Sequence, residues 1–383
     1  MILKQKTLRP IALLLMLAIS PFAKSQVDFT PIFTQIKLEA RTDFDYYHET
    51  NSRNYDVLNP YGFHGRYFNF VIGGPLGEKF SYFFRQRIIA SPGSVSLFDN
   101  TDFLYINYTP SPNWMLRFGK DALAVGGFEY DAPPINVLFS TNYWDNFYCF
   151  QPAVAAAYKT DDANHMLLFQ VANSPYVHYG ADLGYGLGNE WKSGLMSFNL
   201  FYSGKVGHLK LLHSVNMFQR PDRKFMNYIA IGHELEYEHW DIYLDLIHHA
   251  NGLEDWGNNF AVVSCANVYF NKEWNIFVKG AYEQNHSDNA LPGFGIGNNI
   301  DLGYYDIFCQ TGSSHLTYGL GMEYHPKVNP DFRLHAFVAN RRTATPDVVT
   351  NSLRANIGIT WSMEIYRMLK QRMARIMQEN QQQ

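Results

Sequence analysis

The chain has 383 residues and a formal net charge of −4, and its residues are 16% aromatic but only 17% charged. This acidic balance supplies no basic surface and argues against nucleic-acid binding. Its three cysteines, Cys149, Cys265 and Cys309, are odd in number and far apart, which argues against a disulfide framework.

The N-terminus has the pattern of a secretory signal peptide. Basic residues precede an apolar run over residues 11–19, and small residues suit cleavage before Gln26. We therefore expect residues 1–25 to be removed. The formal charge then falls from −4 to −8, because four basic residues are lost: Lys4, Lys6, Arg9 and Lys24.

After the signal peptide the chain shows alternation instead of long apolar runs. No stretch of eighteen apolar residues is present, so we expect no membrane-spanning helix. In the first segment Ile36 and Leu38 share one face, whereas Lys37 and Glu39 share the other. Soluble strands show this over about five residues. Here it persists over about nine to eleven residues, enough to cross a bilayer at a tilt.

Such segments recur about sixteen times between residues 26 and 363, which predicts an all-β transmembrane antiparallel β-barrel. An even number of strands returns both ends of the chain to one side of the membrane. The segments begin near residues 35, 65, 79, 102, 113, 150, 165, 193, 207, 226, 241, 259, 274, 315, 331 and 352.

The connectors alternate in length, which predicts the orientation. The short ones are 74–77, 110–112, 161–163, 204–206, 238–239, 271–272 and 326–328. The long ones fall near 48–63, 91–100, 122–148, 174–191, 219–225, 250–258, 285–313 and 343–350. Short periplasmic turns and long extracellular loops are typical of bacterial outer-membrane barrels.

The third long connector, residues 122–148, loses the strand period and contains paired glycines and paired prolines. A loop of this length is uncommon unless it is functional, so we expect it to fold into the lumen and narrow it. Gly119-Lys120, followed by Gly126-Gly127-Phe128-Glu129-Tyr130-Asp131, resembles the fifth-strand and constriction-loop signature of the phosphate-selective porin O and P family.

The resemblance covers most of the mature chain and implies an outer-membrane porin that assembles as a homotrimer. It also implies contact with outer-membrane lipids, passage of small anions or other hydrophilic solutes, and folding by the barrel-insertion machinery. The family's fuller pattern, Gly-Lys-Phe-Lys-x-Pro-Phe-Gly-x-Glu, contains a lysine and a proline that this chain lacks. The departure weakens the phosphate selectivity that the resemblance implies, but not the barrel.

Placing charges by strand face predicts two opposed walls in the lumen, which would orient water and polar solutes. The alternative is that these charges are merely hydrated. The basic wall comprises Arg66, Arg85, Arg87, Arg117, Arg333, Arg341 and Arg354, with Lys120 at the base of the loop. The acidic wall comprises Glu234, Glu236, Glu238, Asp241 and Asp245.

The loop itself carries Glu129, Asp131 and Asp145 but no lysine or arginine. A strongly anion-selective pore would be expected to carry basic residues at its narrowest point. We therefore expect Arg85, Arg87, Arg117 and Lys120 to face Glu129 and Asp131, with only a weak preference for anions or phosphate. A structural alternative is that Glu129 pairs with wall arginines and holds the loop in place.

A catalytic barrel is one alternative, because His248-His249-Ala250-Asn251-Gly252 resembles the His-x-Ser-Asn-Gly motif of outer-membrane phospholipases and lipid A deacylases. Those barrels use the histidine to activate a serine. Ala250 stands at the serine position, so no nucleophile is present. We expect no enzyme activity, no catalytic residues, no metal site and no cofactor.

After Met363 the alternation ends, and apolar residues recur at helical spacing with basic residues between them. Residues 364–383 are therefore expected to form a periplasmic tail, amphipathic at first and disordered at its polar end. The whole chain is interpreted as an outer-membrane porin for passive diffusion of small hydrophilic solutes. The alternatives are a substrate-specific channel for a sugar or peptide, or a catalytically inactive structural surface barrel.

Overall fold

The protein is described from a computed structural model that covers residues 32–51, 60–88, 98, 100–147, 149–176, 194–220, 223–250, 256–286, 295–296, 300–301, 312–329 and 331–381. The predicted signal peptide lies outside the described residues, as do parts of several predicted long loops, including most of residues 285–313.

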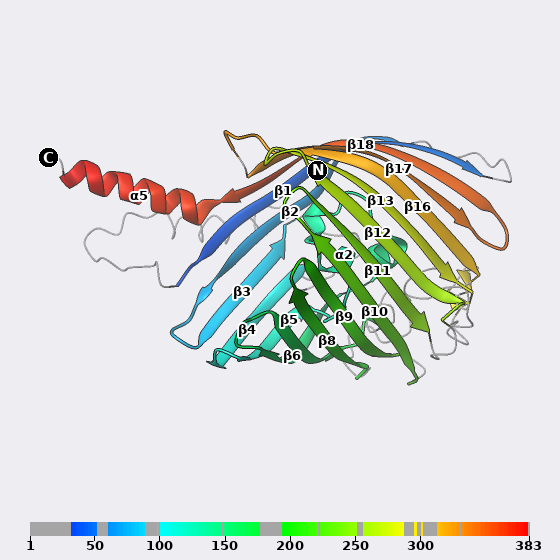
Figure 1. The fold of residues 1–383 in the computed structure, drawn as a ribbon, viewed down its shortest axis with the longest axis horizontal. Coiled ribbons are helices and arrows are strands. Elements are labelled where there is room, and N and C mark those ends of the chain that lie inside the picture. The colour runs from blue at the N-terminus through cyan, green and yellow to red at the C-terminus, as the bar shows by residue number, and fades with distance from the viewer. Residues whose placement is uncertain are drawn as a thin grey trace, which may run out of the picture.

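Sixteen strands close into one antiparallel barrel, as the alternation predicted, and each strand pairs with its neighbours in chain order (Figure 1). Closure joins β1 (Gln35–Asn51) to β18 (Val349–Glu364), with Arg41 opposite Thr360. The other strands are β2 (Tyr61–Pro75), β3 (Phe80–Arg87), β4 (Thr101–Ser111), β5 (Trp114–Ala122), β6 (Phe150–Lys159), β7 (His165–Asn173), β8 (Met196–Val206), β9 (Leu209–Gln219), β10 (Phe225–Glu236), β11 (Trp240–Ala250), β12 (Asn259–Tyr269), β13 (Trp274–Asn285), β16 (Ser313–Tyr324) and β17 (Phe332–Ala344). A separate two-stranded sheet pairs β14 (Gly295–Ile296) with β15 (Ile300–Asp301).

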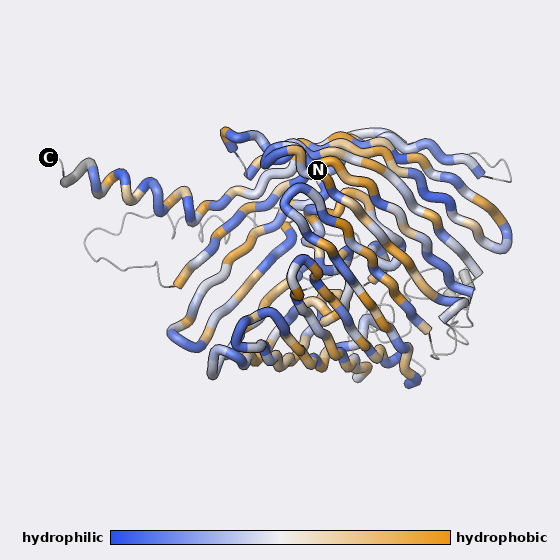
Figure 2. The backbone as a smooth tube through the Cα atoms, in the orientation of Figure 1, coloured by the Kyte–Doolittle hydropathy of each residue, from blue (hydrophilic) through white to orange (hydrophobic). Residues whose placement is uncertain are grey.

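The two faces of the barrel differ because side chains alternate along every strand. Figure 2 shows hydrophobic and hydrophilic residues following one another along the strands. On β13, Ile276 and Val278 are exposed on the outer face, whereas Asn275 and Lys279 are buried in the lumen. This inversion of the usual soluble pattern is the one that a lipid-embedded barrel requires.

Aromatic residues gather on the outer surface beside the short turns. Trp114 pairs with Tyr158, and Trp274 pairs with Tyr324, with ring centroids 5.2 and 4.5 Å apart. Aromatic girdles of this kind lie at the interface between lipid and water. They therefore define one membrane boundary at the short-turn end of the barrel.

The chain beyond the barrel is helical. Helix α5 (Ile365–Gln381) follows β18 directly and leaves the barrel at the end where the short turns lie (Figure 1). Its exposed apolar residues include Leu369 and Met373, which are spaced by one helical turn. Among the described residues, no helix has the length and apolarity needed to cross a membrane.

The orientation of the barrel gives a first testable prediction. Asp347 lies in the β17–β18 connector, at the end of the barrel that carries most of the long loops, and Lys327 lies in the β16–β17 connector at the opposite end; both are exposed. These two connectors themselves depart from the predicted lengths, because residues 345–348 join β17 to β18 and residues 325–331 join β16 to β17. With the native cysteines replaced, Asp347→Cys should react with an impermeant thiol reagent on intact cells. Lys327→Cys should react only after the outer membrane is permeabilised. The reverse pattern would show that the long loops face the periplasm.

Candidate constriction and charged lumen

The segment from Leu123 to Phe147 crosses the lumen, and it enters by running along the inner face of β7 to β9. Gly126 donates its backbone N–H to Ser214 Oγ at 2.8 Å. A Cβ on Gly126 would lie 2.6 Å from the Leu212 carbonyl oxygen, and Gly127 has a φ of 100° that few other residues adopt. The paired glycines therefore allow the loop to lie directly against the β9 backbone.

Wall carboxylates bind both short helices of the loop at their N-termini. The Asp245 carboxylate of β11 accepts the backbone N–H groups of Phe128 and Glu129 at 2.8 and 3.0 Å, at the start of α2 (Phe128–Asp131). Glu283 of β13 accepts those of Asn142 and Tyr143, both at 3.0 Å, at the start of α3 (Asn142–Asn146). The otherwise unpaired N–H groups of each helix end are thereby satisfied.

Glu129 is the central anchor of the loop. Its carboxylate forms a buried ion pair with Lys279 of β13, and it accepts hydrogen bonds from the Thr141 N–H at 3.1 Å and Thr141 Oγ1 at 2.6 Å. Lys279 also donates to the Phe139 carbonyl oxygen at 2.7 Å. This ion pair joins the two halves of the loop to the wall.

Three arginines on the far side of the lumen bind loop carbonyl oxygens. Arg41 of β1 donates to Val137 at 2.8 Å, and Arg333 of β17 donates to Ile135 at 3.0 Å, in the turn η1 (Pro134–Asn136). Arg341 donates to the Ser140 carbonyl oxygen at 2.5 Å. The loop is therefore held from both sides, as a strut across the barrel.

Apolar packing reinforces these polar anchors. Leu123, Val125, Tyr143 and Phe147 of the loop form one buried cluster with residues of the wall. The wall contributes Ala172, Phe218, Met226, Tyr228, Ala230, Ile247, Ala261, Val263 and Ala281, joined by Tyr176 and Leu195. Burial of side chains of this size stabilises by about 1.5–3 kcal/mol each, so this packing adds to the polar anchors of the loop.

On the side of the lumen formed by β1 to β5, β17 and β18, arginines outnumber the carboxylates that they bind. Eight arginines share six carboxylates: Arg41 and Arg66 bind Asp43, Arg66 and Arg354 bind Asp45, Arg85 and Arg87 bind Asp102, Arg117 binds Asp121, Arg333 binds Glu323, and Arg341 binds Asp145. Arg66 and Arg87 have side chains that are 33% and 31% exposed. This set is called the arginine wall below.

Several predicted pairings on the basic side are wrong. Glu129 binds Lys279 and not a wall arginine, and Arg85, Arg87 and Arg117 bind carboxylates of β4 and β5 instead of facing Glu129 and Asp131. Each of these three arginines reaches a carboxylate on its own side of the lumen, so its side chain does not cross the lumen to find a partner. Arg333 is largely buried against the loop, so it is an anchor and not a solute contact.

Lys120 does not line the lumen. On β5 the inward positions are Arg117, Gly119 and Asp121, so Lys120 points to the outer face with Phe118. Its ammonium donates to the Phe98 carbonyl oxygen at 2.6 Å, in the connector between β3 and β4. The sequence prediction followed the family signature here, although strand alternation already assigned Lys120 to the other face.

The predicted acidic residues do not form an uninterrupted wall. Glu238 lies in the β10–β11 turn and not on a strand, and Asp245 is occupied by the start of α2. Lys210 of β9 binds Glu234 at 2.9 Å and Glu236 at 2.7 Å. Asp241 remains in the lumen, hydrogen-bonded by Asn267 and Tyr269.

Three anchors were not among the predicted site residues: Arg41, Lys279 and Glu283. The sequence does contain a signal for them, because each is a charged residue on the inward face of a strand whose outer face is apolar. A long side chain at mid-strand in a filled lumen must reach a partner, and the loop is the nearest polar backbone. Among the described residues, no group of three or more potential metal ligands is present.

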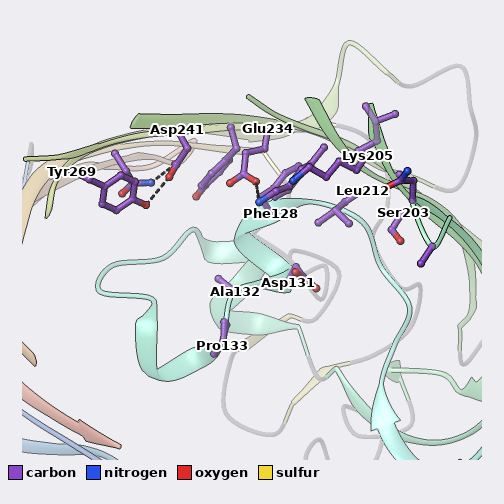
Figure 3. Close-up of a pocket in the computed structure, with 17 residues that line it drawn as sticks. Phe128, Asp131, Ala132, Pro133, Ser203, Lys205, Leu212, Glu234, Asp241 and Tyr269 are labelled. Atoms are coloured by element: carbon purple, nitrogen blue, oxygen red, sulfur yellow. Dashed lines mark hydrogen bonds and ion pairs between the residues drawn. The ribbon is translucent and has the colours of Figure 1, made fainter. Parts of the chain in front are cut away.

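A cavity of about 520 Å³ lies between the tip of the loop and the inner face of β8 to β12 (Figure 3). Phe128, Asp131 and Pro133 line it from the loop, and Lys210 and Asp241 line it from the wall. It reaches the short-turn end of the barrel, because Ala163 and Asn164 of the β6–β7 turn also line it.

Comparison with known proteins agrees with this geometry. The family model described as phosphate-selective porin O and P matches residues 35–251. No match was found among curated protein sequences. The outer-membrane channel DcaP of Acinetobacter baumannii has a TM-score of 0.59 at 12% identity, covering 89% of this chain and 99% of that chain.

Two further solved structures share the architecture. An anion-selective porin from Comamonas acidovorans gives a TM-score of 0.54 at 9% identity, covering 86% of this chain and 98% of that chain. A loop-deletion form of OmpT from Vibrio cholerae gives 0.52 at 10% identity, with the same two coverages. At these identities the likeness shows a common fold.

Proposed function

This chain belongs to the phosphate-selective porin O and P family, and on that premise we propose that its loop 123–147 and its arginine wall together form the selective part of an outer-membrane diffusion channel. Small hydrophilic solutes pass through the barrel without chemical conversion. The loop sets the narrow section, because buried ion pairs and helix-end hydrogen bonds hold it across the lumen.

The proposed selectivity is a weak preference for anions. The observation that supports it is that Arg66 and Arg87 are about one third exposed, although each shares its carboxylate partners with another arginine. Guanidinium groups present paired donors that suit phosphate and carboxylate oxygens. Most of this charge is already compensated, and the loop contributes exposed Asp131 and Asp145, so a strong preference is not expected.

Two arginines can be neutralised without leaving a carboxylate unpaired. Without Arg87, Asp102 still binds Arg85, and without Arg66, Asp43 and Asp45 still bind Arg41 and Arg354. The variant Arg66→Gln/Arg87→Gln should therefore shift the reversal potential under a KCl gradient toward cation selectivity. Screening beyond about 10 Å at 0.1 M salt makes such local charges decisive.

The matched control is Lys120→Gln, which removes one positive charge from the outer face of β5. It should leave the reversal potential of the native channel unchanged, and the single variant Arg87→Gln should shift it. If Lys120→Gln shifts the potential as much as Arg87→Gln does, the proposed selective wall is in the wrong place. Assembly as a homotrimer is a further proposal from family membership, and chemical cross-linking in membranes would test it.

A further inference from the structure

The cavity beside the loop tip carries uncompensated negative charge. Lys210 binds both Glu234 and Glu236, and Lys205 binds Glu236 at 3.4 Å. The two lysines are thus matched by two glutamates. This leaves Asp131 and Asp241, which face the cavity from opposite sides (Figure 3).

Neither aspartate forms an ion pair within the part of the chain that the structure describes, and Lys210, which attracts the Asp131 carboxylate, is already paired with two glutamates. Asp241 accepts hydrogen bonds from two neutral groups, Asn267 Nδ2 and the Tyr269 hydroxyl, both at 2.6 Å. The Asp131 side chain is exposed at the end of α2 and accepts no hydrogen bond from a described residue. Two carboxylates that face one cavity create a negative potential there.

Aromatic side chains add a second feature that favours cations. Phe128 on the loop and Tyr243 on β11 have ring centroids 6.0 Å apart and nearly parallel planes, and Tyr269 lines the same cavity. The faces of aromatic rings attract ammonium groups and pack against their alkyl chains. A volume of about 520 Å³ is in the range that accommodates small organic ligands.

We propose that this cavity is a binding subsite for solutes that carry an alkylammonium group, such as diamines or amino acids with a basic side chain. The ammonium group contacts Asp131 and Asp241, and the alkyl chain lies against Phe128 and Tyr243. The inference rests on the proposed channel function, since solutes reach the cavity through the lumen. It gives the channel an amine-binding side opposite the arginine wall.

The test uses the full-length channel in planar bilayers, with 1,5-diaminopentane as the probe and 1,5-pentanediol as its uncharged match. The diamine should interrupt the KCl current at lower concentrations than the diol. In Asp131→Asn the half-blocking concentration of the diamine should rise about threefold, and in Asp131→Asn/Asp241→Asn about tenfold. The half-blocking concentration of the diol should be the same in the native channel and in all variants.

The control variant is Glu78→Gln, which removes the same charge from an exposed position in the β2–β3 turn. The diamine should block this variant at the same half-blocking concentration as the native channel. Equal block by diamine and diol in the native channel, or an unchanged half-blocking concentration in Asp131→Asn, would overturn the proposal. Because Asp131 is exposed, its variant decides the matter even if Asp241→Asn fails to fold. Absence of any KCl conductance would instead contradict the channel function itself.

Discussion

Deleting residues 132–140 should raise the single-channel conductance by roughly twofold or more, because current through a pore is limited by its narrowest section. The deletion removes the carbonyl oxygens of Ile135, Val137 and Ser140, which bind the arginines on the far side of the lumen. Of the contacts with these arginines, the remaining loop would keep those of Arg341 with Asn142 and Asp145. The measurement is single-channel current in planar bilayers under symmetrical KCl.

The deletion needs a control, since it also exposes buried side chains. Shortening the β17–β18 connector within residues 345–348, which lies outside the lumen-crossing loop, should leave the conductance unchanged. In the loop-deletion variant, the largest solute size that passes the channel should rise together with the conductance. If the conductance stays at the native value, the current passes by a route that this loop does not narrow.

The second large effect concerns the buried pair of Glu129 and Lys279. Their side chains are only 1% and 7% exposed. Glu129→Ala leaves the ammonium of Lys279 buried without its counter-charge, and loss of one partner of a buried ion pair costs about 3–5 kcal/mol. The loop should detach, which should appear as a noisier current and a lower midpoint for heat unfolding.

A double variant separates loss of the pair from loss of packing. In Glu129→Gln/Lys279→Met neither charge remains, and replacing both members of a buried pair is often close to neutral. This variant should recover most of the thermal midpoint that Glu129→Ala loses. If Lys279→Met alone is as stable as the native protein, Glu129 tolerates burial without Lys279, and the pair does not hold the loop.

The barrel could be predicted from the sequence because its signal is local. Alternation with period two needs only neighbouring residues, and it persists over bilayer-spanning lengths, as in β1 and β18. Lys120 shows how strongly this signal should be weighted. Alternation assigned it to the outer face, and the structure agrees, whereas the family signature led to the opposite assignment.

The partners of lumen residues depend on tertiary structure. Glu129 and Lys279 are 150 positions apart, and Asp245 and Phe128 are 117 apart. A strand pattern gives the face on which a charge lies but not the group that it meets across the lumen. That choice depends on strand register, on the β-bulge that redirects Arg66, and on the path of an irregular loop.

The sequence thus determined the barrel, its turns and its lumen-facing positions. Only the folded chain decided which charges anchor the loop and which remain available to solutes, because long-range pairing leaves no local period in the sequence.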